Sequence, residues 1–463
     1  MATLPEEILE AIFIKLQPRS RVVDFTECSN EQLSSTLAAI CLVRKSWYRI
    51  AMPLHYHTVE VYGLVSRRHC SSLNVSGTTF QLGCFLTALL RNRKLASHVK
   101  NLKVELTHAG DHVGDNRRKF DQVNLCDELL QLWPLKAWKR RNIMKMVEHW
   151  HGDAELAVLV PLCNELESLE LIAPEIKHFE ELMTTALALQ RNCRTSPLPK
   201  LNTLALRPKA RPKTADEALP KDLAEFIRLP TIKTLFCAKM ACIPQHRQER
   251  MANITRVHLE DAAMYPLAFP RLFSAFSNLI HLEVRNIEPG HCPFSPESLG
   301  SLLQQCATRL VTLTLVLKQQ FLLSFIPWTH GPLGALVNLR HLTTTRIALI
   351  EGITKRIGSA PPPGRLANTL PVGLETLCIE MCSEIYYEYE PEEGPLTWTA
   401  YRAEDQHGFD QFWSPLWTYV TQYCSTAANL RQVELKGLVP EQHNISIPGW
   451  SVTKLGSVLL TRD

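Results

Sequence analysis

A short pattern of apolar residues returns ten times along this chain and constrains its fold more than any other feature. Two apolar residues stand three positions apart, and a third follows two positions later. The copies begin at Val99, Leu166, Leu201, Ile232, Ile254, Leu279, Leu310, Leu339, Leu374 and Leu430. The alternation in the last four residues of each copy predicts a short strand with one buried face. Because one such strand cannot bury that face alone, the copies must stack side by side.

The spacing of the copies adds a second element to each unit. From the second copy to the ninth, consecutive starts are 22 to 35 residues apart, so insertions are expected. Apolar runs that begin at Phe179, Asp222 and Glu297 lie between copies and predict outer helices. The pattern resembles degenerate leucine-rich repeats, which implies an irregular α/β solenoid over residues 61–463. Chance recurrence of leucine is the alternative, and the near-regular order of the copies disfavours it.

The polar residues that alternate with the buried ones predict a second, solvent-facing side of the sheet. Ser168 and Glu170 are expected to face outward in this way. In four later copies the outward residues are Arg256 with His258, His281 with Glu283, Thr312 with Thr314, and His341 with Thr343. We expect this face to bind a protein substrate through Arg256, His258, His281, Glu283 and His341, the alternative being a solvated face without a partner. His281 and His341, about 10 Å apart across two strand spacings, are too distant for a shared zinc ion.

Three polar segments interrupt the repeats. Residues 108–119 are glycine-containing, and residues 207–213 are basic and punctuated by proline, so both are interpreted as solvated loops. Residues 384–395 are acidic and aromatic and are also predicted to form a loop. Its tyrosines supply contact area amid negative charge, so partner binding is one interpretation and a solvated loop the other. They are Tyr386, Tyr387 and Tyr389.

The first fifty residues predict two helices. An apolar stripe runs from Leu4 to Leu16, with Thr3 and Glu6 placed as a capping box. Residues 17–36 are polar and predict a loop. The next apolar block predicts a second helix that ends at Pro53.

Three segments of this region resemble an F-box of the filamentous-fungal type. They are LPEEILEAIFIKL at residues 4–16, LVRKSWYRIA at residues 42–51 and PLHY at residues 53–56. The chain departs from the family at Arg44, where cysteine is usual, and in its longer connector. The resemblance implies a helical domain over residues 1–60 that docks on the small adaptor of SCF ubiquitin ligases. The implied adaptor-binding residues are Leu4, Pro5, Ile8, Leu9, Leu42, Val43 and Trp47, whereas Ile12, Phe13 and Ile40 would form the internal core.

Composition excludes several classes of protein. The 463 residues include 50 basic and 46 acidic side chains, and a net charge of +4 does not indicate nucleic-acid binding. No secretory signal and no apolar run of about 18 residues is present, so we expect no membrane association. The expected location is intracellular, cytoplasmic or nuclear, with the fourteen cysteines reduced.

Motifs for chemistry are also missing. The cysteines form no C-x-x-C pair, and the closest histidine pairs lack other metal-binding side chains beside them, so we expect no metal and no cofactor. Nucleophile-elbow, P-loop, dinucleotide-binding and zinc-protease motifs are absent. The sequence therefore predicts a protein that is not an enzyme.

These features together predict a non-catalytic subunit that recruits protein substrates to an SCF-type cullin–RING ubiquitin ligase. The implied partners are the SCF adaptor, through it the cullin and RING subunits, and an unknown protein substrate. Two alternatives stay open. One is a leucine-rich-repeat interaction scaffold without a ligase role, and the other is an enzyme whose site is assembled across the repeats.

Overall fold

A computed structural model divides the chain into two compact units. Unit 1 comprises Met1–Lys213 with Leu219–Ala238, and unit 2 comprises Thr214–Ala218 with Lys239–Asp463. The structure describes residues 5–16, 30–66, 80–108, 120–131, 136–148, 152–172, 198–207, 229–238, 253–261, 263–264, 276–289, 303, 309–317, 333–345, 370–380, 385–389, 398–402, 417, 420–436, 447–454 and 457–463.

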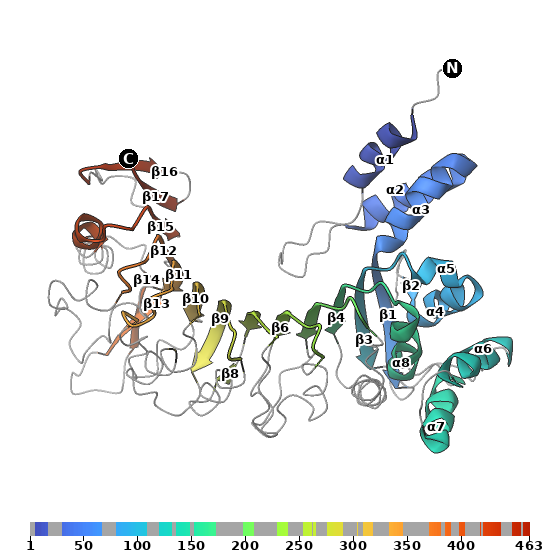
Figure 1. Cartoon of the computed structure of the whole chain (residues 1–463). Coiled ribbons are helices and arrows are strands. Elements are labelled where there is room, and N and C mark those ends of the chain that lie inside the picture. Colours follow the sequence, from blue (N-terminus) through green and yellow to red (C-terminus); the bar gives the residue numbers. More distant parts are fainter. Residues whose placement is uncertain are drawn as a thin grey trace. The chain divides into compact units, whose positions relative to one another are not determined.

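Unit 1 contains a parallel sheet in the order β2-β1-β3-β4-β5-β6 (Figure 1). Its strands are β1 (Thr58–Ser66), β2 (Phe80–Gln81), β3 (Asn101–His108), β4 (Ser168–Ile172), β5 (Thr203–Arg207) and β6 (Thr234–Ala238). The first four copies of the sequence pattern form β3 to β6, and the same position of each copy stands in register. Asn101 pairs with Ser168, Ser168 with Thr203, and Thr203 with Thr234.

Five helices in the described part of unit 1 follow β2 and β3 in the chain (Figure 1). They are α4 (Leu82–Arg91), α5 (Arg93–Ala96), α6 (Phe120–Gln131), α7 (Ala137–Glu148) and α8 (Gly152–Leu162). Helices α4 and α8 contact β1 and each other. Every residue of α8 from Gly152 to Val160 is buried, because α8 packs against α4, α6, α7 and β1 at once. Among the helices in the described part of the chain, none is long and apolar enough to cross a membrane.

Three helices precede β1: α1 (Glu6–Lys15), α2 (Asn30–Val43) and α3 (Lys45–His57). Their common core consists of Leu9, Phe13, Leu37 and Ala51, with Ile40, Trp47, Ile50 and Leu54 packed against it. The rings of Phe13 and Trp47 meet edge to face, with centroids 5.7 Å apart. Helix α3 runs directly into β1 at Thr58, so these helices join the repeats without a linker. The predicted boundary at residue 60 stays a prediction.

Four expectations about these helices were wrong in detail. Helix α1 begins at Glu6 with Pro5 as its N-cap, so Glu6 is the first helical residue and not the third, as the predicted capping box requires. Helix α2 already begins at Asn30, within the predicted loop. Extended backbone at Arg44 (φ −153°) then splits the second apolar block into two helices. Helix α3 continues through Pro53, because packing of its apolar face outweighs the one backbone hydrogen bond that proline removes.

Unit 2 contains the remaining six copies as β7 (Arg256–Glu260), β9 (His281–Pro289), β10 (Thr312–Leu317), β11 (His341–Thr345), β12 (Thr376–Glu380) and β15 (Gln432–Lys436). These strands are parallel neighbours in that order, and β8 (Ala263–Met264) adds a short parallel pairing to β9. Strand β11 forms although Thr344 places a polar residue at an inward position. Thr344 is fully buried and donates its hydroxyl hydrogen to the carbonyl of Thr345.

The sheet of unit 2 ends in an antiparallel hairpin. Strand β17 (Ser457–Arg462) pairs antiparallel with both β15 and β16 (Trp450–Lys454). A second antiparallel pair, β13 (Ile385–Tyr389) with β14 (Trp398–Arg402), forms its own small sheet. The prediction of a loop over residues 384–395 was therefore wrong for residues 385–389, because a partner strand further along the chain supplies their backbone hydrogen bonds.

All ten predicted strands are present, and their inward leucines, isoleucines and valines are buried. The chain is therefore a mixed α/β protein built from stacked parallel repeats. The outward positions differ from the prediction in unit 1, where Ser168 and Glu170 are buried. Of the three predicted outer helices, the structure describes four residues: Leu303 is helical and buried, whereas Leu229, Arg309 and Leu310 at the ends of the runs are not helical. The predicted loops at residues 108–119 and 207–213 lie outside the described residues, except that their first residues, His108 and Arg207, are the last residues of β3 and β5.

Candidate protein-interaction surfaces

The N-terminal helices leave several apolar side chains uncovered. Leu42 is 88% exposed and Val43 is 59% exposed at the end of α2, and Ile8 of α1 is 48% exposed. Pro5 is exposed as well, whereas Leu4 lies outside the described residues. These exposed positions include four of the seven residues that the sequence assigned to adaptor binding. Each is a candidate contact for an apolar partner.

The other two described residues of that set lie inward. Leu9 is only 7% exposed and belongs to the core of the three helices, and Trp47 packs against that core. Ile12, in contrast, was expected inside and is 47% exposed. The helical period explains why Leu9 is buried and Ile12 is exposed. Leu9 and Phe13 form the buried stripe of α1, whereas Ile8 and Ile12 lie one turn apart on its uncovered side.

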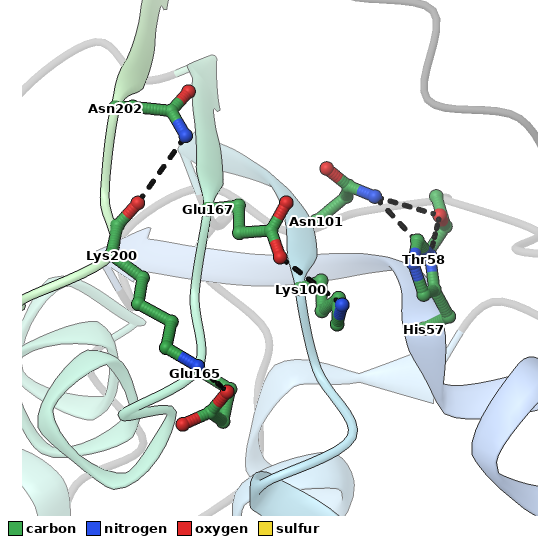
Figure 2. Close-up of polar contacts among 8 residues, drawn as sticks. All are labelled: His57, Thr58, Lys100, Asn101, Glu165, Glu167, Lys200 and Asn202. Atoms are coloured by element: carbon green, nitrogen blue, oxygen red, sulfur yellow. Dashed lines mark hydrogen bonds and ion pairs between the residues drawn. The ribbon is translucent and has the colours of Figure 1, made fainter.

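Polar contacts fix these helices to the repeats at the edge of unit 1 where the strands begin. Figure 2 shows the side-chain nitrogen of Asn101 between two acceptors, 3.3 Å from Nδ1 of His57 and 3.2 Å from Oγ1 of Thr58. The backbone N–H of Lys100 also donates to the carbonyl of His57 over 3.1 Å. Burial and the nearby Lys100 ammonium lower the pKa of His57, so its ring stays neutral and accepts from Asn101 at neutral pH. The end of α3 and the start of β3 are thus held together.

Ion pairs continue along the same edge. The ammonium of Lys100 lies 3.2 Å from the carboxylate of Glu167, and Lys200 pairs with Glu165 (Figure 2). Both pairs are partly solvent-exposed, so each contributes little to stability. These pairs make the edge where the strands begin, the turn edge, polar, with opposite charges paired to each other.

In unit 2 the outward residues form an open face with three rows that cross the strands. The register aligns the members of each row, and the alternating burial of residues such as Val257 and Leu259 places all rows on the face opposite the leucine core. The first row is Arg256, His281, Thr312, His341 and Thr376. The second row is His258, Glu283, Thr314, Thr343 and Cys378. The third row includes Glu260, Arg285, Thr345 and Glu380.

Glu283 is the centre of an ion-pair network in the second and third rows. Its carboxylate oxygens lie 2.5 Å from Nδ1 of His258 and 2.5 Å from Nε of Arg285. The hydrogen bond from His258, with help from Arg285, lowers the pKa of Glu283 to about 2. Nη1 of Arg285 also donates to Glu380 over 3.0 Å, and although burial opposes it, the two carboxylates raise the pKa of Arg285.

The structure brings all five predicted substrate-binding residues of the repeats onto this face, and their role in binding stays a prediction. Sequence analysis missed Arg285 and Glu380, because the pattern was followed for six residues only and these two occupy the next outward position. The alternation in β9 and β12 continues far enough to have shown them. Strand β13 includes Tyr386, Tyr387 and Tyr389, whose side chains lie outside the described part of the structure. The described residues contain no cluster of three or more histidine, cysteine, aspartate or glutamate side chains that could hold a metal ion.

No protein-family model and no curated protein matches this chain. Among solved structures, the chain is similar to an internalin, InlF, from Listeria monocytogenes, with 8% identity over 68% of this chain and 88% of that one and a TM-score of 0.26. It is also similar to the structure of the Rad7 and Elc1 complex in yeast, with 12% identity over 81% of this chain and 88% of that one and a TM-score of 0.27. At these identities and TM-scores, neither similarity carries an argument about function.

Proposed function

We propose that this chain is a non-catalytic substrate receptor of an SCF-type cullin–RING ubiquitin ligase. In this proposal α1 to α3 form an F-box that binds the ligase adaptor, and the open face of unit 2 binds the protein substrate. The chain itself does no chemistry, because the other ligase subunits transfer ubiquitin and this chain only presents the substrate.

The observation that carries the proposal is the exposure of Leu42 and Val43. Both lie at positions that the F-box resemblance assigns to the adaptor, and both project from the end of α2 without covering neighbours. Burying a leucine side chain is worth roughly 1.5–3 kcal/mol, so an apolar partner at this position gains affinity from Leu42 alone. Two consecutive exposed aliphatic residues at the expected contact therefore support a docking role.

A double substitution tests the proposal. We expect Leu42→Ala with Val43→Ala to weaken binding of the recombinant adaptor by about 2 kcal/mol or more, measured by calorimetry on the full chain. Since both side chains are exposed, the thermal unfolding midpoint should change little. Ile14→Ala is the matched control. Ile14 is also exposed, but it belongs to α1 and is not one of the residues that the resemblance assigns to the adaptor. Undiminished adaptor binding by the double variant, or an equal loss with the control, contradicts the F-box assignment.

A repeat scaffold without a ligase is the second candidate function. It is favoured by the burial of Leu9 and the packing of Trp47 inside the three helices, together with the direct passage of α3 into β1. These features suit helices that cap the first repeat strand. Affinity purification from the native cell separates the two functions, since a scaffold would recover protein partners without adaptor or cullin.

A further inference from the structure

The three rows of the open face in unit 2 differ in how their charges are paired. In the second and third rows, Glu283 is held by His258 and Arg285, and Glu380 is held by Arg285. Arg285 and Glu380 belong to β9 and β12, so their contact spans the two intervening strands. Thr314 and Thr345 of those intervening strands are buried. This part of the face is therefore internally neutralised and partly closed.

The first row has the cation Arg256, two imidazole rings and no carboxylate. Arg256 is exposed and forms no ion pair among the described residues, and the partly exposed His281 and His341 follow on β9 and β11. Thr312 and Thr376 complete the row as neutral side chains. On the turn side, the carboxylate of Glu375 lies 3.8 Å from Nε of Arg340 and is thereby paired. The first row consequently offers the exposed charge of Arg256 and two imidazole rings, with no carboxylate of its own.

Two further observations support an anionic partner at this row. Burial, together with Arg256, His258 and His341 nearby, lowers the pKa of His281, so its ring is neutral at neutral pH and takes part as a hydrogen-bonding group. Nδ1 of His341 lies 2.8 Å from the hydroxyl of Thr376. When that hydroxyl donates to Nδ1, the neutral ring carries its proton on Nε2 and can donate it to an incoming carboxylate.

The spacing of the row indicates what kind of anion it fits. Arg256 and His341 are three strand spacings apart, about 14 Å, with His281 between them. In an extended peptide, side chains on one face repeat every 6.6–6.8 Å or so, and positions i and i+4 lie about 13–14 Å apart. A phosphate would need several donors that converge on one point, whereas Arg256, His281 and His341 lie on three different strands. Carboxylates distributed along a peptide match the arrangement better.

We propose that the first row, Arg256 with His281 and His341, docks an extended acidic segment of the protein substrate, with Asp or Glu at alternate positions. The assignment of that segment to a substrate rests on the proposed function. The row itself acts as an electrostatic guide that draws such a segment to the open end of the face.

The test is fluorescence anisotropy at low salt with the purified full chain and a labelled Glu-Gly-Glu-Gly-Glu peptide. We expect this peptide to bind, and Gln-Gly-Gln-Gly-Gln to bind at least about tenfold more weakly. Arg256→Glu with His281→Glu should weaken binding of the acidic peptide by about tenfold or more, and added salt should weaken it further. The control is Arg431→Glu with Lys436→Glu, two exposed cations outside the first row. It should change binding by less than about twofold, because general attraction falls off with distance.

Several results would overturn the proposal: equal binding of the two peptides, equal losses in both double variants, or tighter binding of a phosphoserine peptide of the same charge. Binding that emerges only after Glu388, Glu390, Glu392 and Glu393 are changed to glutamine would assign the row to this chain's own acidic segment instead. The assay contains no adaptor. Failed peptide binding with intact adaptor capture therefore removes this inference alone, and failed adaptor capture with intact peptide binding removes the ligase role alone.

Discussion

The strands of the two units share one sequence pattern and one register, yet their outward faces differ. In unit 1, β4, β5 and β6 are buried on both sides, and Ala205 with Phe236 forms a separate buried cluster. In unit 2, β7, β12 and β15 alternate between buried and accessible residues. The repeat pattern thus accounts for the strand and its inner face, while tertiary packing determines whether the fifth residue of a copy lies in core or at the surface.

Two glutamates at that fifth position make the difference concrete. Glu170 in β4 is buried, and burial raises its pKa even though Arg207 lies 3.0 Å away. Glu283 in β9 is the centre of the open network, and its pKa is lowered to about 2. Burial therefore disfavours the ionised carboxylate of Glu170 in unit 1, whereas the contacts of Glu283 stabilise its ionised carboxylate in unit 2.

The largest expected effect comes from truncating the fifth residue in each unit. Phe236→Ala removes a buried ring from unit 1 and should lower the free energy of unfolding by about 3–5 kcal/mol. Thr343→Ala changes an accessible hydroxyl in unit 2 and should stay within about 0.5 kcal/mol. Urea denaturation of the full chain measures both values. Similar losses in the two variants would show that the outward faces are equally buried, which contradicts the comparison.

The pH dependence of the two glutamates gives an intermediate effect. The lowered pKa of Glu283 means that its stabilisation is present above its ordinary value of 4.5 and is lost as the pH falls toward about 2. Glu283→Gln should therefore cost about 2 kcal/mol at pH 7, after allowance for partial exposure, and progressively less below pH 4.5.

Glu170→Gln is the matched variant in unit 1. Because the pKa of Glu170 is raised, ionisation disfavours the folded state, and any stability it gives is present at low pH and lost as the pH rises. The glutamine variant should thus lose less than about 1 kcal/mol at pH 7, since the polar contact to Arg207 remains possible. Denaturation at several pH values compares the variants, and equal costs at pH 7 would be inconsistent with opposite environments.

The smallest effect is expected at the turn edge of unit 1. Lys100→Ala removes the exposed pair with Glu167 and should change the free energy of unfolding by at most about 0.5–1 kcal/mol. Asn101→Ala should cost more, because it removes both side-chain contacts that tie β3 to the end of α3. A larger loss from Lys100 than from Asn101 would mean that charge, and not the amide, fixes this edge.

The repeat strands could be predicted from the sequence because their signal is local. Each copy carries its own alternation, and the buried positions Leu169 and Leu282 follow from it directly. Strand β1 was not anticipated, since its sequence lacks the leading apolar residues of the pattern. The helices of the first fifty residues were predicted by periodicity, while their ends depended on the backbone at Arg44 and on packing around Pro53.

The contacts that distinguish the two units are long-range and could not be predicted in the same way. Arg285 and Glu380 are 95 residues apart in sequence, and only the stacking of the repeats brings them together. The pairing of β13 with β14 likewise depends on a partner outside the segment itself. Glu170 has the same local pattern as Glu283, so its burial reflects tertiary packing that alternation does not encode.

The antiparallel hairpin at the end of unit 2 bears on self-association. A stack of parallel strands is a template, because its last strand offers unpaired N–H and C=O groups to the same strand of another molecule. Strand β17 occupies those groups of β15 in the opposite direction and buries Val458 and Leu460 against the core. Among the described strands, the one at this edge of the sheet is then the short strand β16. Proteolytic loss of β17 would reopen the template, and the expected outcome is growth into fibres by an otherwise intact fold.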